Sequence, residues 1–357
     1  MYSSENENFF MKIKLAVSLK LNKVKPGLLF ILIIPLLCAS SCQKDGSIGS
    51  TGNGLNSSGQ NNSGATAGAN STLFATNQPI SLDGKSNLTI IGDTINGGNL
   101  SCITLTNCSN IRITHCKLIN SSNEGINLLN CSMIQIDSNY IANVSTGIYV
   151  LSSNSIKVVY NQMKNIQGPY PKGAFIQFNN VSGSNNNVAY NRLENIAGQS
   201  NPEDAISMFK SNGIAASPIL ITNNWIRGGG PSLTGGGIML GDNGGSYQVA
   251  TNNVLVNPGQ YGMAVSGGTN MQIVNNTIYS VSEPFSNVGI YYWNQSGLPS
   301  SAVKIDSNKV KFASGLYGGE NDFWIGSGSS TPIGWNTNYW GANIDASILP
   351  STIITAK

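Results

Sequence analysis

Apolar and polar residues alternate in short segments along most of the chain after Leu88. Each segment has a period-two apolar stretch, which usually ends in Asn, and a further apolar residue follows two positions later. Eight such segments superimpose, at residues 110–119, 133–142, 155–164, 186–195, 219–228, 247–256, 271–280 and 303–312. A period of two predicts β-strands rather than amphipathic helices.

The aligned segments share one column that is mostly asparagine. Its members are Asp93, Cys116, Asn139, Asn161, Asn191, Asn224, Asn253, Asn276 and Asn308. A recurring unit with two or three short strands indicates a solenoid, in which each coil stacks about 4.8 Å above the last. We therefore expect Asn224 and Asn253 to lie directly above one another, with their side-chain amides hydrogen-bonded.

A second strand recurs between the first ones, as a small residue, an apolar residue, any residue and another apolar residue. It occurs at residues 102–105, 125–128, 147–150, 173–176, 205–208, 237–240, 262–265 and 289–292. The sequence thus predicts an all-β fold, a single parallel β-helix of about nine to ten coils over residues 72–357. Residues 72–84 and 335–350 are expected to cap its ends, where open sheet edges would recruit other chains.

These repeats resemble those of the right-handed parallel β-helix family, the pectin-lyase-like fold, over residues 80–330. The resemblance implies right-handed coils. It does not imply one activity, because this fold hosts many functions. Leucine-rich repeats are the competing interpretation, but the chain lacks their Leu-rich consensus.

The first 42 residues are typical of an export signal. A basic region, residues 12–25, precedes an apolar one, residues 27–37, which is too short to span a membrane. The segment Ala39-Ser40-Ser41-Cys42 resembles a bacterial lipobox, which implies lipidation of Cys42. We expect a lipoprotein signal peptide at residues 1–42, with ordinary secretion and an uncleaved anchor as the alternatives.

The next segment, residues 43–71, is rich in Gly, Ser and Asn and predicts a flexible tether. Its first residues, Gln43-Lys44-Asp45, resemble the export signal of surface-exposed bacterial lipoproteins. We therefore expect an extracytoplasmic protein, exposed at the surface of the outer membrane and held there by its lipid alone.

Composition narrows the possible functions. Only 10% of the 357 residues are charged, and the single histidine, His115, excludes chemistry that needs several histidines. Five of the 19 basic and two of the 16 acidic residues precede Cys42, so 14 of each follow it. This neutral balance argues against nucleic acid as a partner. The cysteines fit the coils as small buried residues, although Cys108 and Cys131, one unit apart, could instead form a disulfide.

Three consecutive middle coils, which follow Asn161, Asn191 and Asn224, are longer than the early coils at both turns beside the second strand. Insertions of this kind usually build the binding face of a solenoid. We therefore expect a groove along the outer face of that strand, suited to a long linear polymer. Strand alternation gives its outward side chains as Tyr149, Phe175, Gln177, Ser207, Phe209, Tyr291 and Trp293.

Exposed aromatic rings are costly unless they stack on a partner, and sugar rings are suitable partners. We expect the outward residues of the groove, together with Glu203, to bind a polysaccharide. The alternative is that the longer loops cover these rings.

Charged residues converge on the same predicted groove: Glu203, Asp204, Lys210, Arg227 and Asp242. Residues 205–211 resemble a strand end of some polysaccharide lyases that carries a Lys, although those enzymes have an Arg where this chain has Asp242. Lys210 could abstract the proton α to a uronate carboxylate. Arg227, or Ca²⁺ held by Asp204 and Asp242, could neutralise that carboxylate.

Two other interpretations of the charged residues stay open. Asp204 and Asp242 could be the carboxylate pair of a glycoside hydrolase, or Lys210 and Asp242 could form only a surface ion pair. The sequence favours a surface-anchored protein that binds a polysaccharide and could cleave it by β-elimination, with no required cofactor. A non-catalytic glycan-binding, structural or adhesion module is the alternative, and the oligomeric state stays open.

Overall fold

The computed structural model describes residues 71–357 except 93, 170–172, 296, 299 and 356–357. The predicted signal peptide, Cys42 and the tether up to residue 70 lie outside this part. The described part consists of β-strands and turns with two short 3-10 helices, η1 (Trp335–Thr337) and η2 (Ala346–Ile348). It has no helix long and apolar enough to cross a membrane.

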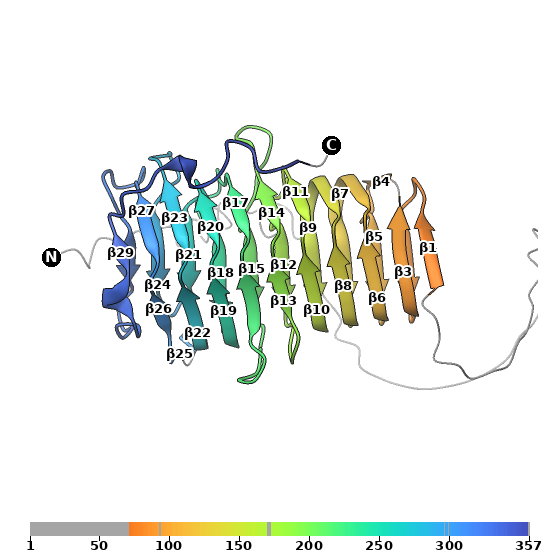
Figure 1. Ribbon diagram of the computed structural model, residues 1–357, viewed down its shortest axis with the longest axis horizontal. Helices are drawn as coiled ribbons and strands as arrows, with labels where there is room; N and C mark the ends of the chain where they lie inside the picture. The colour runs from red at the N-terminus through yellow and green to blue at the C-terminus, as the bar shows by residue number, and fades with distance from the viewer. Residues whose placement is uncertain (1–70, 93, 170–172, 296, 299, 356–357) are drawn as a thin grey trace, which may run out of the picture. The chain divides into compact units, whose positions relative to one another are not determined.

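The strands form three sheets that run the length of the coils, and every pairing between coils is parallel (Figure 1). Sheet 1 contains β1 (Ser71–Ala75), β3 (Ser86–Gly92), β6 (Ser109–Thr114), β8 (Ser132–Asp137), β10 (Asn154–Val159), β13 (Asn187–Ala189), β16 (Ile219–Thr222), β19 (Ser246–Thr251), β22 (Gly268–Val274), β25 (Ser300–Ser301) and β26 (Lys304–Asp306). Strands β25 and β26 both pair with β22 and so belong to one coil. The number of coils therefore agrees with the predicted nine to ten.

Sheet 2 follows sheet 1 in each coil, and sheet 3 follows sheet 2. Sheet 2 contains β4 (Thr94–Gly98), the first halves of β7 (Lys117–Leu129) and β9 (Tyr140–Leu151), then β11 (Gln162–Lys164), β14 (Arg192–Glu194), β17 (Trp225–Arg227), β20 (Val254–Val256), β23 (Thr277–Ser280), β27 (Lys309–Phe312) and β29 (Tyr339–Trp340). Sheet 3 contains β2 (Ile80–Asp83), β5 (Ile103–Thr106), the second halves of β7 and β9, then β12 (Ile176–Asn179), β15 (Ile206–Phe209), β18 (Ile238–Asp242), β21 (Tyr261–Val265), β24 (Val288–Tyr292) and β28 (Phe323–Ile325).

Inward side chains from all three sheets make one continuous apolar core. In sheet 3, for example, Ile126, Ile148, Ile176 and Ile206 lie in register on successive strands, and each is fully buried. Burying such a side chain stabilises the fold by about 1.5–3 kcal/mol relative to leaving it exposed. The predicted all-β, right-handed parallel β-helix is confirmed.

Asparagine side chains form a ladder at the corner where sheet 1 meets sheet 2. Each amide Nδ2, and the backbone N–H of the same residue, donates to Oδ1 of the asparagine one coil further on. The ladder runs through Asn139, Asn161, Asn191, Asn224, Asn253, Asn276, Asn308 and Asn338. Asn224 Nδ2 lies 2.9 Å from Asn253 Oδ1, so the predicted stacking is confirmed.

The four described cysteines, Cys102, Cys108, Cys116 and Cys131, are buried in the first coils and make no disulfide. They act as small core residues, and burial raises the pKa of the Cys102 and Cys116 thiols to about 11.

The C-terminal segment has two roles, of which one was predicted. Trp335 and Trp340 pack against the last coil, and β29 pairs with β27, as expected of a cap. The residues after Trp340 instead turn back along sheet 2, seen as the dark blue segment in Figure 1. They reach as far as β11, where Thr355 hydrogen-bonds Gln162.

Candidate functional site

The predicted groove corresponds to the outer face of sheet 3. Tyr149, Gln177, Ser207 and Tyr291 lie on this face in one register column. Tyr149 and Gln177 are half-buried, whereas Ser207 is 1% and Tyr291 2% exposed. The sheet is therefore covered in the coils where the prediction placed a sugar.

Phe175 is not an outward residue, and the prediction of an exposed ring there is wrong. Ile176 pairs with Ile148, so Phe175 lies beside Gly147, and its side chain is fully buried in the core. The predicted alignment was displaced by two residues in this coil, because the longer turn before β12 moves the strand along the sequence. Gln177 occupies the position in register with Tyr149 that Phe175 was expected to take.

The remaining rings of the predicted groove pack against other parts of the protein. The Tyr291 ring meets Tyr261 edge to face at 5.2 Å between centroids, and the Trp293 ring meets Trp324 in the same way at 5.6 Å. Phe209 is half-buried, with Lys210 Nζ 5.3 Å from its ring centroid. Tyr291 is therefore buried against side chains of strands β18, β21 and β28.

Asp204 lies buried beneath the loop that follows β17. Its carboxylate accepts hydrogen bonds from the Tyr261 hydroxyl and from the backbone N–H of Gly236 at 3.1 Å. Burial raises the pKa of the Asp204 carboxyl well above its usual value, and the charge of Glu203 raises it further. Glu203 itself accepts hydrogen bonds from the hydroxyls of Ser232 and Thr234. Both acids thus hold this loop in place.

Lys210 and Asp242 are joined through their backbones, since Lys210 N–H donates to the Asp242 carbonyl at 2.8 Å. Their side chains make no ion pair in the described structure, and the Lys210 side chain is exposed. Burial raises the pKa of the Asp242 carboxyl, while the nearby Ser207 hydroxyl opposes that rise. The Ser207 hydroxyl lacks the geometry of a full hydrogen bond to any described group.

Arg227 lies on sheet 2, and the prediction that it belongs to the groove of sheet 3 is wrong. Its guanidinium donates to the carbonyls of Ala346 and Leu349, both at 2.9 Å. The fold therefore brings Asp204 and Asp242 near each other but gives Arg227 to the C-terminal segment. No sequence signal marked these carbonyl partners, which lie over a hundred residues away.

Ca²⁺ binding by Asp204 and Asp242 stays a prediction. The described residues contain no group of three or more His, Cys, Asp or Glu side chains that could hold a metal ion. A buried carboxyl with a raised pKa stays protonated at higher pH, and a protonated carboxyl is a poor calcium ligand.

Asp204 should make stability depend on pH. Because its pKa is raised by folding, its stabilising contribution is complete below the usual Asp pKa and is lost as pH rises through the folded value. We expect Asp204→Asn, which cannot ionise, to raise the free energy of unfolding near pH 8 and to reduce its slope, by up to about 1.4 kcal/mol per pH unit. Urea unfolding between about pH 4 and pH 8 measures this. The unmodified chain is measured alongside, and an equal slope in the unmodified chain and in Asp204→Asn would contradict the assignment.

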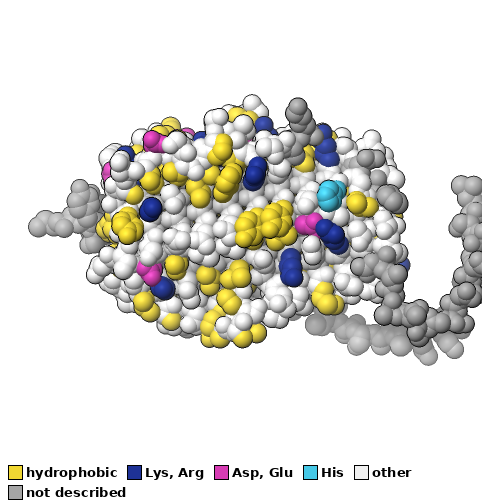
Figure 2. All heavy atoms as spheres, viewed as in Figure 1, with side chains coloured by type: hydrophobic (Ala, Val, Ile, Leu, Met, Phe, Trp, Pro, Cys, Tyr) yellow, Lys and Arg dark blue, Asp and Glu magenta, His cyan; other side chains and the backbone are white. Residues whose placement is uncertain are grey.

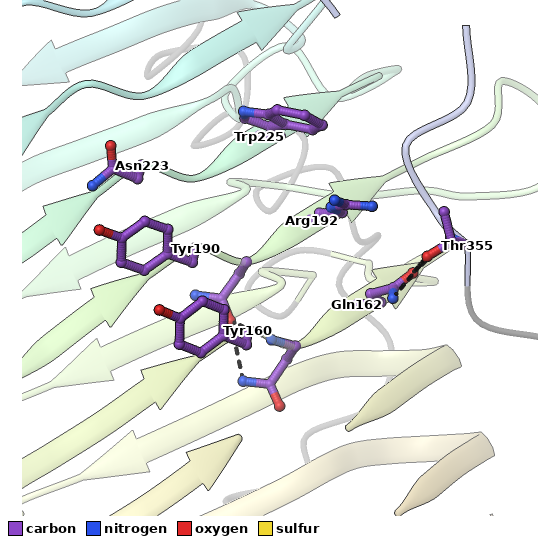
Figure 3. Close-up of a pocket in the computed structure, with 9 residues that line it drawn as sticks. Tyr160, Gln162, Tyr190, Arg192, Asn223, Trp225 and Thr355 are labelled. Carbon is purple, nitrogen blue, oxygen red and sulfur yellow. Dashed lines mark hydrogen bonds between the residues drawn. The ribbon is translucent and has the colours of Figure 1, made fainter. Parts of the chain in front are cut away.

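Exposed tyrosine side chains of the middle coils lie on a surface other than the predicted groove, at the outer corner between sheets 1 and 2. Tyr160 and Tyr190 are 59% and 48% exposed. Their rings stack with centroids 4.9 Å apart and planes 9° apart. Figure 3 shows the two rings turned the same way and offset, with Asn223 continuing the file. We call Tyr160 and Tyr190 the tyrosine pair.

The tyrosine pair borders a hollow of about 510 Å³, whose lining residues are Tyr160, Asn161, Gln162, Tyr190, Asn191, Arg192, Asn223, Trp225 and Thr355 (Figure 3). The Arg192 guanidinium lies over the Trp225 ring, 5.0 Å from its centroid. Among the described residues, the lining thus combines aromatic rings, amides and one cation, with no carboxylate. Figure 2 shows hydrophobic side chains gathered over these middle coils, with Lys or Arg side chains nearby.

The backbone conformation of the tyrosine pair is unusual. Tyr160 (φ 58°) and Tyr190 (φ 57°) occupy the left-handed turn that directly precedes the asparagine ladder. Other coils place residues with smaller side chains there: His115, Ser138, Asn223, Asn252, Asn275 and Ser307. A left-handed conformation costs a bulky residue about 1–2 kcal/mol, whereas Asn tolerates it. Strain of this kind is a reason to suspect function.

The sequence carried a signal for the tyrosine pair that the prediction did not use. In the aligned segments, Tyr160 and Tyr190 directly precede ladder asparagines in two adjacent units. The residue before a buried turn asparagine must point outward, so two consecutive tyrosines in that column mark a stacked, exposed pair.

Comparison with known proteins agrees with the fold. Residues 78–254 match the family described as right handed beta helix region. No curated protein matches the chain. The matched residues include the tyrosine pair and most of the asparagine ladder, and the match agrees with the right-handed parallel β-helix fold of the structure.

Proposed function

We propose that the protein binds a polysaccharide at the hollow beside the tyrosine pair. The observation that carries this proposal is the exposed stack of Tyr160 and Tyr190 in left-handed turns, where other coils have smaller residues. The two rings give an apolar surface for the C–H faces of a sugar. Gln162, Asn223 and Arg192 supply hydrogen-bonding groups for its hydroxyls around that surface.

The arrangement favours binding over cleavage. Proton abstraction by Lys210 would need a site that excludes solvent and a group that neutralises the substrate carboxylate. Lys210 is exposed to solvent, and Arg227 is engaged with the C-terminal segment. We therefore expect no unsaturated products by ultraviolet absorbance, and no new reducing ends, when the protein is incubated with polysaccharides.

We further propose that lipidation of Cys42 displays this site at the cell surface. The apolar segment before Cys42 and the Gly/Ser/Asn-rich stretch after it support an anchored, extended attachment. In cells, Cys42→Ser should move the protein from the membrane fraction to the soluble fraction. Retention of the variant in the membrane fraction would contradict this proposal.

Replacing the tyrosine pair tests the proposed function. The variant Tyr160→Asn/Tyr190→Asn keeps a residue that tolerates the left-handed turn but removes both rings. We expect its affinity for the preferred polymer to fall at least about tenfold, since buried aromatic contacts dominate binding energy. The free energy of unfolding should stay equal or rise by about 1 kcal/mol, because the strain is relieved.

The measurement is titration calorimetry of the full chain with polygalacturonate, alginate, xylan and arabinogalactan. Tyr247→Asn is the matched control. Tyr247 also has a left-handed backbone (φ 50°), but it lies at the start of a sheet 1 strand, whereas the tyrosine pair follows the ends of such strands. Unchanged affinity in the double variant, or an equal loss in the control, would refute a site at the tyrosine pair.

A further inference from the structure

The C-terminal strap, which we define as residues 346–355, lies across sheet 2 and ends at the hollow (Figure 1). We propose that the end of this strap competes with the polysaccharide, so that its displacement extends the binding site from the tyrosine pair across sheet 2. This inference rests on the proposed function of the hollow.

The strap and the hollow share three residues. Gln162, Arg192 and Trp225 all line the hollow. Gln162 also accepts from Thr355 N–H at 2.6 Å, and Arg192 donates to the Ile353 carbonyl at 3.4 Å. Trp225 packs against the apolar cluster that contains Leu349 and Ile353. A ligand that contacts the side chains of Gln162, Arg192 and Trp225 must therefore displace the strap residues that now contact them.

Most of the strap's polar contacts go to its backbone. The Glu194 carboxylate accepts from Ile353 N–H at 2.6 Å, from Ile354 N–H at 3.3 Å and from the Thr352 hydroxyl at 3.0 Å. Glu194 on sheet 2 therefore holds the extended strap through the main-chain N–H groups of Ile353 and Ile354.

The strap is anchored unevenly. In the middle of the strap, Leu349 and Ile353 pack against Val256. Their side chains are 2% and 1% exposed. Thr355 is exposed and is held by hydrogen bonds to Gln162. Such bonds contribute only about 0.5–1.5 kcal/mol each, so the end should open locally far more often than the coils unfold. The strap is thus suited to give way at the end that covers the hollow.

Two variants of the full chain test the inference. Deletion of residues 351–357 removes the end of the strap and leaves the Arg227 contacts to Ala346 and Leu349 in place. Glu194→Ala removes one side chain that holds the strap and does not line the hollow. We expect both variants to bind the best polymer of the panel at least about threefold more tightly, with a larger gain for longer oligosaccharides. Ser351→Ala, an exposed strap residue, is the control and should bind as the unmodified chain does.

Hydrogen exchange of the unmodified chain gives a second readout that needs no glycan. The amide of Thr355 should exchange well before those of Ile353 and of the ladder asparagines. Exchange together with the coil amides would overturn the inference, as would equal or weaker binding by both strap variants while Tyr160→Asn/Tyr190→Asn still loses affinity. If no polymer binds to any variant, the proposed function fails, and the competition with it.

Discussion

Asn224→Ala should lower the free energy of unfolding by about 3 kcal/mol, because it breaks the asparagine ladder in the middle of the coils. Asn224 Oδ1 accepts from both the backbone N–H and the amide of Asn191, each at 3.0 Å. Its own amide donates to the Val188 carbonyl and to Asn253, each at 2.9 Å. All of these groups are buried, so alanine leaves donors and an acceptor without water to replace the lost partners.

Urea unfolding followed by circular dichroism measures this loss, and the chain offers a control one residue away. Asn223 is outside the ladder, and within the described part of the chain its amide donates only to the neighbouring Thr222 hydroxyl. Glycine, like asparagine, adopts the left-handed turn at this position (φ 56°) readily. Asn223→Gly should therefore lower the free energy of unfolding by less than about 1 kcal/mol. Equal losses in the two variants would mean that the ladder contributes no more than an ordinary turn side chain.

Gly237→Ala should destabilise the fold by about 3 kcal/mol or more, because the coils leave no room for a methyl group there. A Cβ at this position would lie 2.0 Å from the Gly262 carbonyl oxygen and 2.6 Å from Leu255 Cδ2. Since the closer atom belongs to the backbone of the next coil, relief requires the coils to separate locally. This explains why a small residue recurs in the second strand of each repeat.

Thermal and urea unfolding test this prediction against Gly318→Ala. A Cβ at Gly318 would meet nothing within 4 Å, so only its left-handed backbone (φ 76°) opposes the substitution. That variant should cost about 1 kcal/mol. If Gly237→Ala lowers the free energy of unfolding by no more than Gly318→Ala does, then neighbouring coils adjust easily. In that case packing does not explain why a small residue recurs in the second strand of each repeat.

The sequence predicted what repeats and failed where one coil differs from the rest. Asn224 and Asn253 stack as expected because their spacing reflects a stacking rule that every coil obeys. Phe175 was misplaced because a longer turn shifted the pattern by two positions. Phe175 therefore precedes β12 instead of lying within it, so strand alternation does not apply to its side chain, which is buried in the core.

The candidate site was harder to predict, because its parts come together only in the folded chain. Gln162 and Thr355 are 193 residues apart, and no periodic signal joins them. Arg227 was assigned to a groove because charges are rare in this chain, but its partners are two backbone carbonyls. Backbone carbonyls occur at every residue, so the sequence cannot indicate which ones a guanidinium will find.

The left-handed turn outside the asparagine ladder separates two tasks. The ladder asparagine holds neighbouring coils together, while the residue before it, such as Tyr190 before Asn191, projects outward and is not needed for stacking. Substitutions at Ser138, Asn223 or Asn252 could therefore lengthen or shorten the aromatic file one coil at a time. Ligand preference could diverge along this corner in evolution, or be redesigned, while the scaffold underneath stays the same.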